Sequence, residues 1–243
     1  MGHGVLTVAF HPSYDKLGAA CATITRQHTN LPIHVITNVP DSQRANWPSN
    51  CTFQYVAAAQ CQNRHWKTQA WHHTPFDATL YMDCDVVVLN PGVETIFDTN
   101  SLETTDMVLN PYLTWKTGER VLKIYRDAML KFNVTPPIVV YSGCCNMFHR
   151  TDITRKIYDR WHLHWKATGK GREMPSLACA VALEPTARVF SFPLTVNLDI
   201  IGANPTAVLH HMTAELAGLH KITIPERWCP FDREPNAFSW VDF

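Results

Sequence analysis

The chain has 243 residues, of which 46% are hydrophobic and 17% are charged, enough for one large domain with a substantial core. This composition is typical of a globular protein and excludes an intrinsically disordered chain. Lysine and arginine together number 21, as do aspartate and glutamate, so nothing indicates the broad basic surface that binds nucleic acids or acidic membranes.

Short β-rich segments alternate with helical patterns through the first half of the chain. Pro12 predicts the start of a helix, because its fixed backbone angle suits the first helical turn. The segment 80–89 is apolar apart from Asp83 and Asp85, which is typical of a strand buried on both faces. The predicted elements are strands at 4–10, 32–38, 52–56 and 80–89, and helices from Pro12 and at 63–71.

The second half of the chain mixes helices and strands. Apolar residues recur at helical spacing from Glu119 to Phe132, which predicts an amphipathic helix that Pro136 ends. A further helix is expected at 152–165, and strands at 138–148, 188–198 and 206–212. The alternation in the first half predicts an α/β fold with a Rossmann-like parallel sheet, in which ligands collect at the carboxyl ends of strands. No repeat or linker is visible, so residues 1–243 are expected to form a single domain.

The amino-terminal segment and the cysteines indicate where in the cell the protein is expected. The residues after Met1 lack the basic flank and long apolar core of a signal peptide, and no apolar stretch approaches the roughly 20 residues that span a bilayer. The eight cysteines form no CxxC pair, so free buried thiols in a reducing compartment explain them better than disulfides. We therefore expect a cytoplasmic protein without an integral membrane segment, and the sequence leaves its oligomeric state open.

Asp83 and Asp85 flank Cys84 in the most apolar predicted strand. A buried carboxylate costs free energy unless it is paired or binds a cation. Two carboxylates one residue apart can both reach one divalent cation, which would neutralise a departing diphosphate. Taken alone, the pair is equally consistent with strand-end aspartates that cap a turn or form salt bridges. A phosphatase with Asp83 as nucleophile is a weaker alternative, because three valines follow where that motif continues with Gly-Thr.

Further sequence blocks accompany this acidic triplet in a fixed order. They are 5–10 with Tyr14, 32–38, Lys67, 80–88, 96–97, 141–148, 173–178 and 208–211. In this order, and over nearly the whole chain, they resemble the GT-A glycosyltransferases, most closely family 8, which includes glycogenin and bacterial galactosyltransferases. The resemblance implies a GT-A fold, with a mixed, mainly parallel central sheet flanked by helices.

The same resemblance implies a function and its cofactors. Residues 1–90 would form the nucleotide-binding half, and residues 91–243 would bind the sugar and the acceptor. The implied reaction transfers a hexose from a nucleotide-sugar donor, expected to be a UDP-sugar, to a hydroxyl group of a glycan or another acceptor. It implies Mn²⁺ or Mg²⁺ as the cation, and retention of the anomeric configuration rather than inversion.

Each block also implies roles for particular residues. The metal ligands would be Asp83, Asp85 and His210. The register of the last block favours His210 over His211, and since neighbouring strand residues point to opposite faces, only one of the two can bind. The residues implied near the reacting sugar, and so in catalysis, are Ser142, Gly143 and Glu173. The residues implied to bind the nucleotide or its phosphates are Ala9, Phe10, Tyr14, Thr37, Asn38, Arg64, Lys67, Asp83, Cys84 and Lys221.

The chain departs from the family at two positions. Tyr141 stands where the family usually has Asn, and Met174 stands where it has Gln, an amide placed near the reacting carbon. These departures keep open a second hypothesis, a non-catalytic module that binds a nucleotide sugar or a carbohydrate on the same fold. Slow hydrolysis of the donor in the presence of manganese would argue against that hypothesis.

Overall fold

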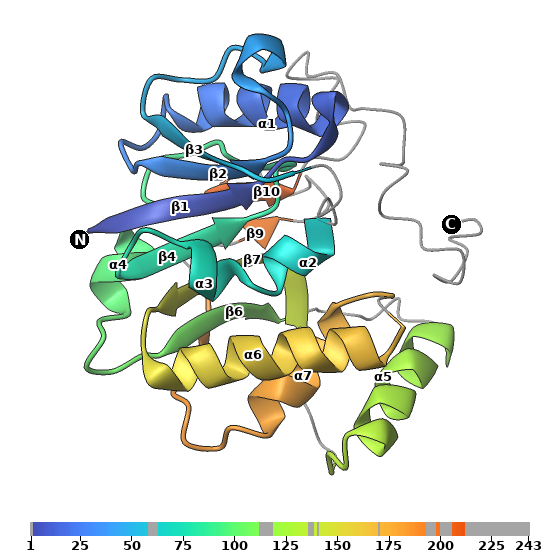
Figure 1. Ribbon diagram of the computed structural model, residues 1–243. Helices are drawn as coiled ribbons and strands as arrows, with labels where there is room; N and C mark the ends of the chain where they lie inside the picture. The colour runs from blue at the N-terminus through green and yellow to red at the C-terminus, as the bar shows by residue number, and fades with distance from the viewer. Residues whose placement is uncertain are drawn as a thin grey trace.

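The computed structural model describes residues 2–57, 63–111, 119–135, 139, 141–169, 171–192, 198–199 and 206–211. Its centre is a seven-stranded sheet with the strand order β3-β2-β1-β4-β7-β6-β8 (Figure 1). The strands are β1 (His3–Val8), β2 (Ile33–Thr37), β3 (Cys51–Tyr55), β4 (Ala78–Met82), β6 (Met107–Pro111), β7 (Tyr141–His149) and β8 (Val189–Ser191).

The direction of the strands agrees with the sequence-based expectation of a mixed, mainly parallel sheet. Strands β3, β2, β1 and β4 run parallel to one another, and β6 runs parallel to β8. Only β7 is antiparallel to both of its neighbours, β4 and β6. The carboxyl ends of β1 and β4 therefore meet at the same edge of the sheet.

A second, three-stranded sheet lies next to the acidic triplet. It consists of β5 (Val86–Val88), β10 (Leu209–His211) and β9 (Leu198–Asp199). Strand β10 runs antiparallel to β5, and His211 is paired with Val86. This pairing brings a late segment of the chain beside the residues that directly follow the triplet.

Helices lie along both halves of the main sheet. They are α1 (His11–Thr25), α2 (Asn63–Lys67), α3 (Ala70–His73), α4 (Thr95–Thr99), α5 (Glu119–Lys131), α6 (Asp152–Ala167) and α7 (Met174–Ala182), with a 3₁₀ turn at η1 (Asp41–Gln43). Helix α1 lies beside the β2–β3 end, whereas α6 and α7 lie toward β6 and β7 (Figure 1). Pro12 stands in the first turn of α1, as the sequence predicts. No helix in the described ranges is long and apolar enough to span a membrane.

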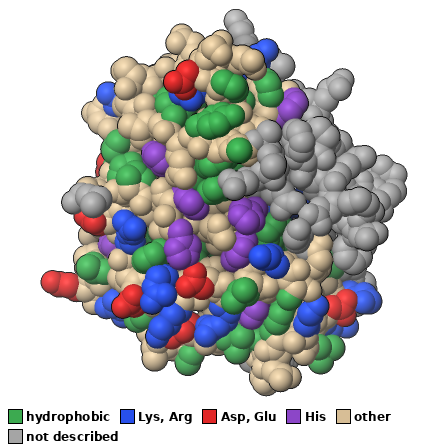
Figure 2. Space-filling model, viewed as in Figure 1, with side chains coloured by type: hydrophobic (Ala, Val, Ile, Leu, Met, Phe, Trp, Pro, Cys, Tyr) green, Lys and Arg blue, Asp and Glu red, His purple; other side chains and the backbone are tan. Residues whose placement is uncertain are grey.

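The core is apolar and aromatic, and the surface carries charges of both signs. Aromatic side chains dominate the core between the sheet, α2 and α6; Phe10 is 1% exposed and meets the ring of Trp66 edge-on at 6.3 Å. Full burial of a side chain of this size contributes about 2 kcal/mol. On the face shown in Figure 2, basic and acidic side chains are interspersed, and several histidines gather near its middle. This mixture of charges is what a net charge of zero leads one to expect.

Two predicted elements are divided in the structure. The prediction of one strand at 80–89 was wrong, because the chain turns between β4 and β5, where the N–H of Val86 donates to the carbonyl of Asp83 at 2.9 Å. The acidic triplet thus occupies a turn between two sheets. The predicted helix at 63–71 is likewise α2 and α3, and the Thr68 hydroxyl between them donates to the carbonyl of His65.

Candidate active site

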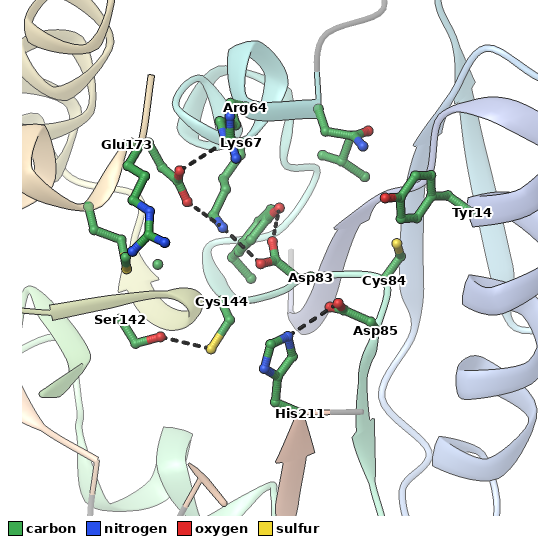
Figure 3. Close-up of a pocket in the computed structure, with 16 residues that line it drawn as sticks. Tyr14, Arg64, Lys67, Asp83, Cys84, Asp85, Ser142, Cys144, Glu173 and His211 are labelled. Carbon is green, nitrogen blue, oxygen red and sulfur yellow. Dashed lines mark hydrogen bonds and ion pairs between the residues drawn. The ribbon is translucent and has the colours of Figure 1, made fainter. Parts of the chain in front are cut away.

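A cavity of about 380 Å³ opens at the carboxyl ends of β1 and β4 (Figure 3). Its volume lies in the range that is typical of small-molecule sites. The side chains around it come from α1, α2, β4, β7, the start of α7 and β10, so segments far apart in the sequence meet here. The edge where parallel strands end is where α/β sheets usually bind ligands.

The two aspartates of the triplet hold different partners. Asp83 Oδ1 accepts a hydrogen bond from the Tyr81 hydroxyl at 2.8 Å, and its Oδ2 accepts one from Lys67 Nζ at 2.8 Å. Asp85 Oδ2 lies 3.2 Å from His211 Nε2, while its Oδ1 is buried and has no hydrogen-bond partner among the described residues. Burial acts to raise the pKa of Asp85, but the adjacent His211 holds it below its ordinary value.

Lys67 is the centre of a buried chain of charges. Its Nζ lies 2.8 Å from Asp83 Oδ2 and 2.9 Å from Glu173 Oε1, and Glu173 Oε2 lies 3.2 Å from Arg64 Nε (Figure 3). Burial acts to lower the pKa of Lys67, but the two carboxylates hold it above its ordinary value. Burial would raise the pKa of Glu173, yet Lys67 and Arg64 lower it to about 2. Lys67 and Glu173 are therefore both charged at neutral pH.

Strand β7 closes one side of the cavity and leaves room at Gly143. A Cβ at this position would lie 2.9 Å from Glu173 Oε1 and 3.3 Å from Lys67 Nζ, too close for the ion pair to stay as it is. The flanking Ser142 hydroxyl is 3.0 Å from Cys144 Sγ. Met174, the first residue of α7, also lines the cavity. The expected residues Ser142, Gly143 and Glu173 are thus brought together.

The structure places His211, and not His210, beside the acidic pair. His211 points into the cavity toward Asp85, whereas His210 is 4% exposed and its Nε2–H donates to the carbonyl of Ala207 at 2.7 Å. The two histidines do face opposite sides of β10, as expected. The register of β10 against β5 decides which of them meets Asp85, and it differs from the register that we inferred from the sequence block.

Several residues expected to bind the nucleotide lie away from the cavity. Ala9 and Phe10 are fully buried in the core. The Thr37 hydroxyl accepts a hydrogen bond from the backbone N–H of Val39, and Asn38 Oδ1 accepts one from the backbone N–H of His11. These side chains therefore stabilise the loops that follow β1 and β2. Lys221 falls outside the described residues.

Other expected residues do line the cavity, together with some that the sequence did not point to. Tyr14 and Cys84 lie on its wall with Arg64 and Lys67. The cavity also includes Arg172, whose only signal in the sequence is its place next to Glu173. Tyr81, which was not expected to have a role in the site, also lines the wall, and its hydroxyl donates a hydrogen bond to Asp83.

The donor groups suit a hard divalent cation, but the arrangement seen here is not a formed metal site. Two carboxylates and an imidazole are ligands that Mn²⁺ and Mg²⁺ accept. The buried Oδ1 of Asp85, which has no hydrogen-bond partner in the described part of the chain, is an oxygen that a cation would satisfy. In the described part of the chain, however, no three His, Cys, Asp or Glu side chains converge as a metal site. Lys67 already forms an ion pair with Asp83. A cation that bound both aspartates would therefore require this ion pair to rearrange.

Comparison with known proteins identifies the fold. No family model matches the sequence, and no curated protein matches it. Solved structures do match: a crystal structure of the galactosyltransferase LgtC in complex with donor and acceptor sugar analogues, and a structure of an active-site mutant of LgtC. Each has a TM-score of 0.61 and covers 86% of both chains, at 12% and 13% identity. The expectation from the sequence is confirmed at the level of architecture: the chain has the GT-A fold of these structures.

Proposed function

We propose that this chain is a metal-dependent glycosyltransferase that moves a hexose from a nucleoside-diphosphate sugar, first of all a UDP-sugar, to a hydroxyl group of a glycan. The observation that carries the proposal is the cavity in which the acidic triplet meets Lys67 and Glu173, at the ligand-binding edge of a GT-A sheet. The similar LgtC structure, which holds donor and acceptor sugar analogues, supports it.

In this proposal, Asp83, Asp85 and His211 hold Mn²⁺ or Mg²⁺. Two observations support this assignment: Asp85 Oδ1 lacks a hydrogen-bond partner among the residues that the structure describes, and His211 lies beside Asp85. The bound cation would neutralise the diphosphate and stabilise it as the leaving group. An imidazole ligand beside two carboxylates favours a transition metal such as manganese over calcium.

Lys67 and Arg64 supply fixed positive charge for the donor, and Glu173 positions both. A carboxylate with a pKa of about 2 is a poor base at neutral pH. In the proposed reaction Glu173 therefore holds the two cations and does not accept the proton of the acceptor hydroxyl. This weak basicity supports retention of the anomeric configuration, because an inverting reaction would need a positioned base on the acceptor side.

The nucleotide is assigned to the part of the cavity near Tyr14. Tyr14 comes from α1 and lies beside the carboxyl end of β1, where Val8 also lines the wall. An aromatic ring in such a position can stack on a base. The sugar is assigned to the opposite side, between Ser142, Gly143 and Glu173.

A thermal-shift screen of nucleotide sugars, each with and without Mn²⁺, tests the proposal. A ligand at about 100 times its Kd stabilises the folded state by about 2.7 kcal/mol, which corresponds to a rise in Tm of about 5–10 °C for a chain of this length. We expect this rise for a UDP-sugar only when Mn²⁺ is present. No shift with any nucleotide sugar, or a shift independent of the cation, would contradict the proposal.

A binding module without catalysis remains the second candidate. It is favoured by the apolar Met174 on the wall of the cavity, where the resembled family has an amide. Both candidates predict a thermal shift, but only the enzyme releases nucleoside diphosphate from the donor. Measuring UDP release with Mn²⁺ present therefore separates the two.

A further inference from the structure

Lys67 already holds the oxygen of Asp83 that faces it, so a cation at the same oxygen would meet the charge of Lys67. Lys67 Nζ already lies 2.8 Å from Asp83 Oδ2, and the other oxygen of Asp83 is held by the Tyr81 hydroxyl. A divalent ion that bound Oδ2 would lie next to an ammonium group in a buried site, where repulsion between like charges is strong. The ion and Lys67 therefore compete for this oxygen.

Lys67 has a second carboxylate on which it can remain. Its Nζ also lies 2.9 Å from Glu173 Oε1, and its side chain is only 7% exposed. A buried ammonium that lost both carboxylates would be strongly destabilising, whereas loss of one leaves it partly compensated. Gly143 provides space at this point, since its missing Cβ would lie 3.3 Å from both Cε and Nζ of Lys67.

The formal charges around the cavity indicate what would take the place of Asp83. Among the described residues that line the cavity, and apart from His211, the positively charged side chains equal the negatively charged ones in number; they are Arg64, Lys67 and Arg172 against Asp83, Asp85 and Glu173. A divalent cation alone leaves an excess of positive charge, and a diphosphate alone leaves an excess of negative charge. Bound together they restore the balance, so each favours the binding of the other.

We propose that Lys67 is an internal counter-ion, which pairs with Asp83 when no cation is bound and moves to the donor diphosphate when a cation binds Asp83. The inference rests on the proposed function and adds to it a positioning role for Lys67 that couples the two ligands. The exchange involves no covalent step. Lys67 keeps its contact with Glu173 and replaces one anionic partner by another.

Binding of Mn²⁺ in the absence of nucleotide tests the competition. Free Mn²⁺ is measured by electron paramagnetic resonance during a titration of the wild-type protein, Lys67→Met and the control Lys123→Met, which removes an exposed lysine of α5. Because Lys67→Met removes the competing ammonium, we expect it to bind Mn²⁺ about tenfold more tightly than the wild type. The control should be unchanged. Equal or weaker binding by folded Lys67→Met would overturn the inference.

A second variant guards against a folding defect and tests the transfer to the diphosphate. Lys67→Gln removes the charge, but its amide can still donate hydrogen bonds to both carboxylates. If Lys67→Met does not fold, the Mn²⁺ affinity of Lys67→Gln tests the competition in its place. UDP should raise the Mn²⁺ affinity of the wild type, and this gain should be several-fold smaller in both variants. If UDP raised the Mn²⁺ affinity of the variants as much as that of the wild type, the inference about Lys67 would be overturned, but the proposed function would not. A wild-type protein that binds no Mn²⁺, with or without UDP, would overturn the proposed function as well.

Discussion

Asp85 is the residue on which the proposed metal site depends most directly. One of its oxygens faces His211, and the other is buried without a hydrogen-bond partner among the described residues. A buried polar atom left in this state costs about 1–3 kcal/mol. A cation bound there would offset this cost, which gives a physical reason for a carboxylate in the turn after β4.

Asp85→Asn should weaken Mn²⁺ binding at least about tenfold, because it removes a charge and keeps the size of the side chain. Isothermal titration with Mn²⁺ and UDP measures the effect. Asp98→Asn, an exposed acid of α4, is the matched control and should bind like the wild type. If Asp85→Asn bound Mn²⁺ as tightly as the wild type does, Asp85 would not be a metal ligand.

Gly143→Ala should disturb the ion pair between Lys67 and Glu173. The added methyl group would lie 2.9 Å from Glu173 Oε1, and overpacking of a buried site costs about 1–3 kcal/mol. Urea unfolding should therefore show a lower midpoint, and donor affinity should fall. Gly2→Ala, whose new Cβ would have no atom of the described residues within 4 Å, should behave like the wild type. Equal midpoints and affinities would show that the cavity tolerates a Cβ here.

At the residue scale, the sequence points to the charged centre of the site but not to its exact neighbours. The sequence blocks assign Asp83, Lys67 and Glu173 to one site, and in the structure these three side chains do form ion pairs. Which of His210 and His211 faces Asp85 depends on the register of β10 against β5, a pairing between distant segments. Periodicity within one strand shows that successive side chains point to opposite faces, but it does not show which of the two faces lies toward Asp85.

Helix α2 carries Lys67 at the cavity, and histidine side chains take part in the packing of α2 and α3 against α6. His162 Nδ1 lies 2.8 Å from the Thr68 hydroxyl, and the rings of His162 and His65 are 4.9 Å apart. His73 contacts the ring of Trp66 at 4.5 Å. Burial lowers the pKa of both His73 and His162 from an ordinary value of 6.5 to about 4.

The stability of the fold should therefore fall in mild acid. Between pH 6.5 and about 4, the unfolded chain binds protons at His73 and His162 that the folded chain does not, so the free energy of unfolding decreases as pH falls. Urea midpoints at pH 7 and pH 5 measure this, and His162→Gln should reduce the difference. His28→Gln, in the turn after α1, is the control. Identical midpoints of the wild type at both pH values would contradict the prediction.

The split between β4 and β5 shows what an apolar pattern leaves open at the scale of elements. Both strands are fully buried, so residues 80–89 look continuous although the chain turns at the triplet. The two aspartates are the signal for that turn, because charged side chains are more stable at a turn facing a cavity than inside a strand. The pairing of β5 with β10 is long-range and cannot be inferred from the local sequence.

At the scale of the whole molecule, the alternation of strands and helices predicts a parallel, Rossmann-like sheet, and the parallel strands β3, β2, β1 and β4 form this part of the structure. The place of β7 between β4 and β6 does not follow from the sequence, because strand order depends on contacts between distant segments. The cavity forms where this antiparallel strand meets the parallel half, so its outline depends on that long-range arrangement.

The release of UDP from UDP-sugars tests the central claim most directly. The protein is incubated with a panel of UDP-hexoses and Mn²⁺, and proton NMR follows the donor, free UDP and the anomeric signal of the product. We predict that at least one donor releases UDP, that EDTA stops the release, and that Asp85→Asn reduces it at least about tenfold. No release from any donor, or release that is equally fast in EDTA and in Asp85→Asn, would contradict the account.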